Sequence, residues 1–356
     1  MTPFMRILLS LCALLLIGTA LTVTWKALPG KTPAIPTGPA PIAVLEPVEI
    51  GGMTQWLLIR GQDRTAPVLL WLHGGPGAAQ MPLAHAATTR VLERDFVVVH
   101  WDQRGAGKSN PRGFDEATMT MERFLQDAHE VTRYLQERLG TEQVIVLGHS
   151  WGTMLGARLV ARWPEDYAAY IGVGQQVNTK RGIEVTLKRL APLIQAAGRA
   201  EHQRWLDGAA PEALMEHAAY VEMMQMLDDY GGGMNVPVWR LALTLVRAPE
   251  YSLADLRRWL DGANRGSGPM WPDYRSRDLV TEVPVMSVPM LLISGARDLN
   301  TPAELATDWF DQVSAPQGKR HLIFEGSGHA PFLTEPEPFI DAVCRFGEVL
   351  HGEHEK

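Results

Sequence analysis

Short apolar runs of strand length alternate along this chain with segments of helical periodicity. The runs at residues 67–72, 96–101 and 144–148 are almost continuously apolar, as parallel strands buried on both faces are. Between the second and third runs, residues 118–139 place apolar side chains at helical spacing. Strands that alternate with helices predict an α/β fold with a mostly parallel central sheet flanked by helices.

The same patterns divide the chain into parts. Residues 45–177 and 282–356 carry the strand–helix alternation and are expected to form the core. Residues 178–281 are rich in Leu, Met, Trp and Ala with helical periods, which predicts an inserted helical cap. Five prolines fall within residues 29–44, which we interpret as an extended linker.

The N-terminal segment, residues 1–28, resembles a targeting signal. Residues 7–23 form an uncharged run. The length of this run lies between that of a signal-peptide core and that of a membrane span. We therefore expect an exported protein, anchored in a membrane by this single segment with its catalytic part on the periplasmic or extracellular side. If the segment is cleaved after a small-residue site such as Gly18-Thr19-Ala20, the protein is secreted instead.

Composition excludes several other classes of protein. The 356 residues carry a net charge of −7 and contain no long run of Lys or Arg, which disfavours binding to nucleic acid. The 2 cysteines, Cys12 and Cys344, cannot form a disulfide framework, and their positions suggest neither metal nor redox chemistry.

A glycine-rich turn, WDQRGAGKSN at residues 101–110, looks at first like a phosphate-binding loop. Gly107, Lys108 and Ser109 match the end of that motif. The motif also requires a glycine five positions before Gly107, where this chain has Asp102, whose carboxylate would face the phosphates. The turn therefore needs another explanation.

Residues 148–152, GHSWG, match the G-x-S-x-G motif between an expected strand and an expected helix. In that setting a tight turn holds a serine at the start of the helix, and the flanking glycines avoid a clash of side chains. The alternative is a turn of small residues without chemistry. The context predicts that Ser150 is a nucleophile.

A nucleophilic serine needs a base and an acid that orients the base, which follow it along the chain in this arrangement. Asp298 comes directly after the expected strand at residues 290–294, and His329 follows the one at residues 321–325. Ligand and catalytic groups gather at strand ends in open α/β sheets. We therefore predict a catalytic triad of Ser150, Asp298 and His329.

Backbone N–H groups near the serine are expected to stabilise a developing oxyanion. The residue after the nucleophile, Trp151, supplies one of them. The other comes from the loop HGGPG at residues 73–77, where Gly74 or Gly75 can turn an N–H inward.

Together HGGPG, DQRGAGKS, GHSWG, GARD and GSGH resemble the α/β-hydrolase superfamily, and within it the proline iminopeptidase-like branch. The resemblance covers about residues 45–345. It implies acyl transfer through an acyl-enzyme, with no metal and no organic cofactor. It also implies that the turn supports the oxyanion loop, with Asp102 and Arg104 as structural members and Lys108 as a solvated residue.

The substrate is the least determined part of this prediction. The resemblance implies an aminopeptidase that releases N-terminal residues from small peptides, often proline. An esterase or amidase for small hydrophobic acyl groups, or a binding protein without catalysis, are the alternatives. An aminopeptidase must bind an α-ammonium group, and a buried cation needs carboxylate partners. The candidate partners are Glu222, Asp228 and Asp229, for which a solvated helix face is the alternative.

Overall fold

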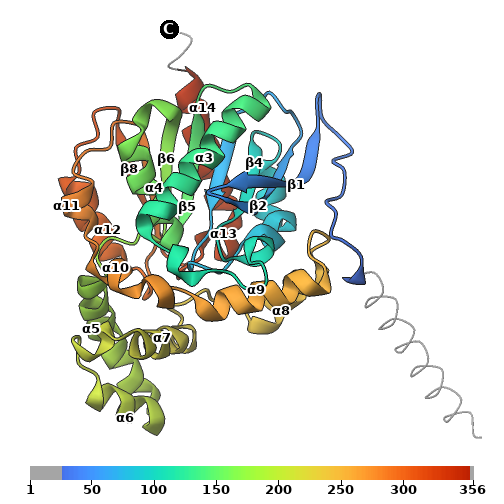
Figure 1. Ribbon diagram of the computed structural model, residues 1–356. Helices are drawn as coiled ribbons and strands as arrows, with labels where there is room; N and C mark the ends of the chain where they lie inside the picture. Colours follow the sequence, from blue (N-terminus) through green and yellow to red (C-terminus); the bar gives the residue numbers. More distant parts are fainter. Residues whose placement is uncertain (1–25, 353–356) are drawn as a thin grey trace, which may run out of the picture.

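The computed structural model describes residues 26–352 and contains one twisted sheet with helices on both faces (Figure 1). The sheet has eight strands in the order β1-β2-β4-β3-β5-β6-β7-β8. The pairs β1–β2 and β2–β4 are antiparallel, and every later pair is parallel. This mostly parallel sheet confirms the predicted fold class.

The strands lie where the apolar runs predict them, with small shifts at their ends. The glycine pair at Gly51-Gly52 adopts positive φ angles of 58° and 73° and turns the first strand into the second. The bounds are β1 Ile42–Ile50, β2 Met53–Gly61, β3 Val68–Leu72, β4 Val97–Asp102, β5 Val144–His149, β6 Tyr167–Val173, β7 Met290–Gly295 and β8 Lys319–Phe324.

Both faces of the central strands are buried, because helices cover each side. In β3, Leu70 packs in one hydrophobic cluster with side chains of α3, α4 and α12. The next residue, Trp71, points to the opposite face and packs with side chains of α14. The covering helices are α2 Ala87–Leu92, α3 Met121–Leu139, α4 Trp151–Arg162, α12 Ala303–Gln312, α13 Pro331–Thr334 and α14 Pro336–Gly352.

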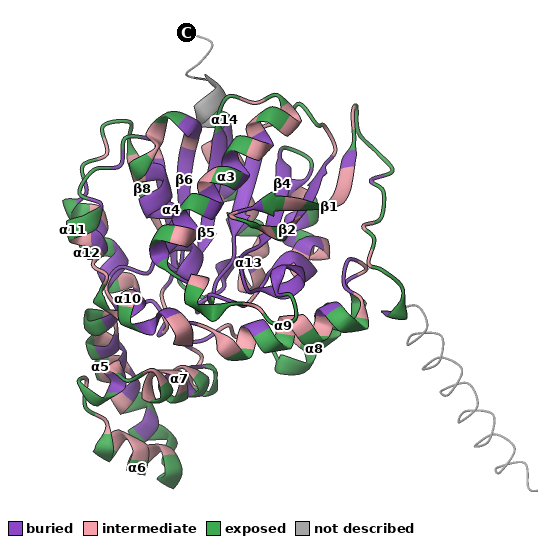
Figure 2. Ribbon diagram, viewed as in Figure 1, coloured by how far each residue is buried: buried purple, intermediate pink, exposed green. Residues whose placement is uncertain are grey.

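Between β6 and β7 the chain leaves the sheet and forms helices near the end where β5 stops (Figure 1). Figure 2 shows much more exposed and half-buried surface here than in the sheet. No residue of α8 is buried. The helices of this segment are α5 Thr179–Ala197, α6 Ala200–Gly208, α7 His217–Met226, α8 Val238–Arg247, α9 Leu253–Arg265, α10 Trp271–Ser276 and α11 Leu279–Glu282.

The proline-rich segment differs from the expected linker, because it packs on the domain. The first strand begins at Ile42 rather than near residue 45. Before it, the backbone N–H of Lys31 donates to the carbonyl of Pro249 at 3.0 Å. The guanidinium of Arg60 in turn donates to the carbonyl of Pro33 at 2.7 Å. These contacts tie the proline-rich segment to β2 and to the segment that follows α8.

The predicted location in a membrane is corrected by the structure. Within residues 26–352, no helix combines the length and the apolar character that crossing a membrane requires. Residues 7–23, on which the prediction of an anchor and of export depended, lie outside the described residues.

Candidate active site

The turn after β5 holds Ser150 in a strained backbone conformation. Its φ of 54° and ψ of −119° are unusual for a residue with a side chain. The backbone N–H of Ser150 donates to the carbonyl of Val173 at 3.0 Å, which fixes the turn to β6. A Cβ atom at Gly148 would overlap the backbone of Gly152, and one at Gly152 would overlap the carbonyl of Leu72. The motif therefore needs glycine on both sides because the backbones approach so closely.

The predicted base and acid are in direct contact. His329 Nδ1 lies 2.8 Å from Asp298 Oδ2, and both side chains are buried. Asp298 Oδ1 accepts hydrogen bonds from the backbone N–H groups of Asn300 and Thr301 at 2.8 and 2.9 Å. Thr301 Oγ1 also donates to Asp298 Oδ2 at 2.7 Å. These bonds hold the carboxylate in one orientation toward the imidazole.

A second histidine, His149, fixes the backbone of His329. Burial lowers the pKa of His149 to about 3, so the ring is neutral at physiological pH. Its Nε2 lies 2.9 Å from the carbonyl oxygen of His329, which can only accept, so Nε2 carries the proton. Nδ1 must then accept from Gln80 Nε2 at 2.9 Å. No sequence motif indicated this bracing role of His149.

The predicted oxyanion loop lies against the serine turn. A Cβ atom at Gly74 would come within 3.2 Å of the Ser150 Cβ, so a side chain there would push the two segments slightly apart. Gly75 has a φ of 118°, a conformation that favours glycine. Trp151 is the first residue of α4, where backbone N–H groups lack partners within the helix. The three predicted donors therefore belong to two backbone segments in contact.

Gln103, in the turn that resembled a phosphate loop, connects these two segments. Its Nε2 donates to the carbonyl of His73 at 3.1 Å, and its Oε1 accepts from Trp151 Nε1 at 3.0 Å. The backbone N–H of Gln103 donates to His73 Nε2 at 3.1 Å. His73 Nδ1 must then donate to the carbonyl of Gly74 at 2.7 Å. Burial lowers the pKa of His73 to about 4, which keeps this ring neutral.

The rest of that turn joins the core to α9. Asp102 is fully buried, and its Oδ2 accepts from Tyr251 Oη at 2.6 Å and from the backbone N–H of Lys108 at 2.7 Å. Burial raises the pKa of Asp102 to about 7. The expectation that Lys108 is solvated is wrong, because its buried ammonium pairs with Asp255 at 2.8 Å. A sequence-local view could not anticipate a partner 147 positions away.

Arg104 has a structural role, as the resemblance implied. Its guanidinium forms two hydrogen bonds with the buried carboxylate of Asp127 in α3, at 2.7 and 3.0 Å. A further N–H donates to the carbonyl of Gly51 at 2.9 Å. The turn is thus fixed on one side to the hairpin of β1 and β2 and on the other to α3.

Ser150 and His329 line the same pocket, which has a volume of about 510 Å³. The oxyanion loop, α7, α8 and α9 contribute to its other walls. Arg265 contributes a permanent positive charge to the described lining, which also contains histidines. No Asp or Glu is among the described residues that line the pocket. Within residues 26–352, no cluster of three or more His, Cys, Asp or Glu side chains has the arrangement of a metal site.

The structure does not bring the three candidate carboxylates to this pocket. Helix α7 presents Tyr220, Val221, Met224 and Gln225 to the pocket, so Glu222 lies on another face of the helix. The other two candidates have protein partners: Asp228 Oδ1 accepts from the backbone N–H of Asn235 at 3.1 Å, and Asp229 pairs with Arg199 at the surface. These partners, rather than a bound ammonium, compensate carboxylates placed near the end of α7.

Comparison with known proteins adds a family to this geometry. Residues 67–336 match a family model described as the alpha/beta hydrolase fold. The probable aminopeptidase YbaC of Bacillus subtilis (strain 168) is 30% identical over 319 residues, which cover 88% of this chain and 97% of that protein. A proline iminopeptidase of Heyndrickxia coagulans is 26% identical over 289 residues, which cover 79% of this chain and 90% of that protein.

Solved structures show the same fold. The crystal structure of a proline iminopeptidase from Mycobacterium smegmatis superposes with a TM-score of 0.62 at 22% identity, covering 86% of this chain and 98% of that one. The crystal structure of VinJ superposes with a TM-score of 0.65 at 23% identity, covering 86% and 99% of the two chains.

Proposed function

This chain belongs to the α/β-hydrolase family, and we propose that it is a serine hydrolase of the aminopeptidase type, which releases N-terminal residues from short peptides. The observation that carries the proposal is the bonded pair of His329 and Asp298 at the pocket that Ser150 also lines. The names of the relatives support a peptidase rather than another hydrolase.

The bonds of His329 support its role as the base. A proton on Nδ1 is donated to Asp298, which leaves Nε2 unprotonated. Nε2 accepts the hydroxyl proton of Ser150 as Oγ attacks the carbonyl carbon of the substrate. The resulting imidazolium is stabilised by the Asp298 carboxylate and then donates the proton to the leaving amine.

The negative charge that develops on the carbonyl oxygen is stabilised by backbone N–H groups. In our proposal these are Trp151 N–H, at the start of α4, and Gly75 or Gly74 N–H from the facing loop. The same groups act again when water, deprotonated by His329, attacks the acyl-enzyme. The acid then leaves, and the proton returns to Ser150.

The described lining of the pocket contains no carboxylate, which favours a second candidate, an esterase or amidase for small uncharged acyl groups. An N-terminal ammonium needs anionic or neutral acceptors when it leaves water. The lining offers side-chain amides, which include those of Gln176, Gln225 and Asn300, but no carboxylate among the described residues. A prolyl substrate would then bind its ammonium group through amide oxygens. An uncharged ring of the same size would bind without the cost of removing an ammonium group from water.

Two experiments test these proposals. Ser150→Ala should remove hydrolysis, since loss of the nucleophile costs about 10⁶-fold in turnover. A fluorophosphonate should label the parent and not the variant; labelling that persists in Ser150→Ala would show that another residue is the nucleophile. A matched pair of para-nitroanilides, prolyl and cyclopentanecarbonyl, then separates the two candidates. The aminopeptidase proposal expects preference for the prolyl compound, and the alternative expects preference for the uncharged one.

A further inference from the structure

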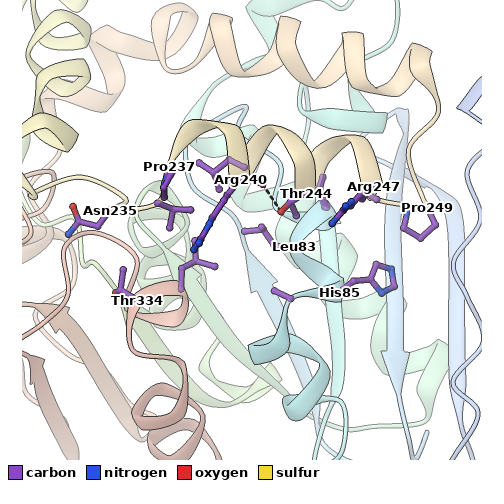
Figure 3. A pocket seen from close by; sticks show the side chains of 15 residues that line it. Leu83, His85, Asn235, Pro237, Arg240, Thr244, Arg247, Pro249 and Thr334 are labelled. Carbon is purple, nitrogen blue, oxygen red and sulfur yellow. Dashed lines mark hydrogen bonds between the residues drawn. The ribbon is translucent and has the colours of Figure 1, made fainter. Parts of the chain in front are cut away.

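Helix α8 crosses a second pocket, which has a volume of about 620 Å³. Figure 3 shows the side chains that line it. The two pockets share four lining residues: Pro82 and Leu83 from the short helix η1 (Met81–His85), and Leu241 and Thr244 from α8. These four side chains form the partition between them. The second pocket is therefore the neighbouring space available to a molecule that extends beyond the catalytic pocket.

The packing of α8 is incomplete. An amphipathic surface helix normally buries its apolar stripe against the core. No residue of α8 is buried, although Leu241 and Leu245 face inward and line the catalytic pocket. The two pockets lie beneath this helix, where a packed core would otherwise be. An occupant would supply the missing contacts for α8.

The second pocket combines apolar walls with positive charge. Arg240 and Arg247 are among its lining residues, and neither forms an ion pair with any described residue. Figure 3 shows Arg240 extending from α8 on the side of Thr334, while Arg247 lies toward His85 and Pro249. The one other ionisable side chain of this described lining, His85, is already paired with the buried Glu250 at 2.8 Å.

From this arrangement we propose that the second pocket binds the C-terminal part of a short peptide substrate, with its carboxylate held by Arg240 or Arg247. The proposal rests on the aminopeptidase function proposed above. With the scissile carbonyl at Ser150, the leaving part of the peptide points away from the acyl side, and each extended residue spans about 3.3–3.6 Å. A few residues therefore suffice to pass the partition.

The chemistry of the pocket selects for this occupant. Guanidinium groups bind carboxylates through paired, charge-assisted hydrogen bonds. The walls, which include Pro82, Leu83, Val236 and Leu333, suit small apolar side chains between the scissile bond and the carboxylate. Arg240 and Arg247 are two helical turns apart, roughly 10 Å along the axis, so each arginine serves a different end of the pocket.

The test compares two peptides, prolyl-trialanine with a free C-terminal carboxylate and the same peptide with a C-terminal amide. In the parent enzyme, we expect kcat/KM to be about 10-fold higher for the carboxylate, the usual size of a charge-assisted bond at a partly exposed site. In the double variant Arg240→Gln/Arg247→Gln this ratio should fall to about one. The single variants show which end of the pocket holds the carboxylate.

Two controls separate this proposal from general effects. Arg257→Gln removes a positive charge from α9, where the side chain is 86% exposed and lines neither pocket, and should leave the ratio unchanged. Prolyl para-nitroanilide has no carboxylate, so its hydrolysis should be the same in the parent and in the double variant. Equal rates for carboxylate and amide peptides in the parent enzyme would overturn the proposal.

Binding distinguishes failure of this proposal from failure of the proposed activity. Titration calorimetry of Ser150→Ala with each peptide measures the carboxylate preference without turnover. If the parent hydrolyses no peptide or anilide but the carboxylate peptide still binds more tightly than the amide, the site stands and the aminopeptidase proposal fails. If the two peptides bind equally, the site is not a carboxylate site.

Discussion

The side-chain carbonyl of Gln103 accepts a hydrogen bond from the indole N–H of Trp151 at 3.0 Å. The amide nitrogen of the same side chain donates to the backbone carbonyl of His73 at 3.1 Å. One buried amide therefore couples the residue after Ser150 to the loop that carries Gly74 and Gly75. The two proposed sources of oxyanion stabilisation depend on this link for their relative position.

Replacing this amide should lower turnover more than binding. Gln103→Leu keeps the size of the side chain but removes both bonds, so the two backbone segments can separate slightly. Loss of a direct oxyanion donor costs about 10²–10³-fold in kcat, and we expect about 10-fold for this indirect effect. Steady-state kinetics on prolyl para-nitroanilide measure it, with the exposed Gln143→Leu as control. An unchanged kcat in Gln103→Leu would mean that the link has no positioning role.

The contact between Asp298 and His329 predicts a larger loss. In Asp298→Asn, a neutral side-chain amide replaces the carboxylate that contacts His329 and Thr301. The ring of His329 thereby loses the anionic acceptor for its Nδ1 proton. The imidazole then adopts the wrong tautomer, which in a triad lowers kcat by about 10⁴-fold. Stopped assays over several hours measure the residual rate. A loss below about tenfold would contradict the assignment of Asp298 as the orienting acid.

Two helical glycines provide a matched test of packing. Gly152, in the first turn of α4, faces the carbonyl of Leu72, whereas Gly182 in α5 faces open space. Gly182→Ala should stabilise the protein by about 0.5–1 kcal/mol, because alanine has the higher helix propensity. Gly152→Ala should destabilise it by about 1–3 kcal/mol or more, because backbone must move. Urea unfolding gives both values; changes of the same sign would contradict the close approach.

The pH dependence of stability follows from four buried groups. Burial lowers the pKa of His73 to about 4 and those of His100 and His149 to about 3, below the unfolded value of about 6.5. Between about pH 4 and 6.5, unfolding thus takes up three protons at these histidines. Asp102 acts in the opposite direction, because burial raises its pKa to about 7 and its proton is released on unfolding.

Unfolding therefore takes up a net two protons, three at the histidines less the one that Asp102 releases. The free energy of unfolding should fall by up to about 2.7 kcal/mol per pH unit as the pH decreases from about 6.5 to 4. Urea unfolding at about pH 7.5 and 5.5 measures the change. In Asp102→Asn the opposing proton is absent, so the slope should become steeper. Stability that is constant or that rises toward lower pH would show that these histidines are not held neutral in the fold.

The local sequence predicted the strands and the turns, because these depend on the backbone conformations that nearby residues allow. The strands and the turn at residues 148–152 follow from apolar runs and from glycines that only a tight strand-to-helix turn requires. The order of Ser150, Asp298 and His329 could likewise be predicted, because each follows a strand and parallel strands end at one edge of the sheet. The predicted anchor lies outside the described residues, and no membrane-spanning helix exists within them.

Contacts between distant segments could not be predicted in this way. Lys108 was expected in solvent, but tertiary packing places it against Asp255, and the bracing of His149 by Gln80 has no sequence motif.

The sequence by itself therefore determined the sheet, the turn that carries Ser150 and the chain order of the proposed triad, because these depend on backbone geometry and on residues close in the chain. The tertiary structure alone decided which side chains line the two pockets. It turned Glu222 away from the catalytic pocket and left Arg240, beside the second one, without an ion pair to any residue that the structure describes. The physical reason is that burial and pairing of a charge depend on segments that meet only when the helices pack over the sheet.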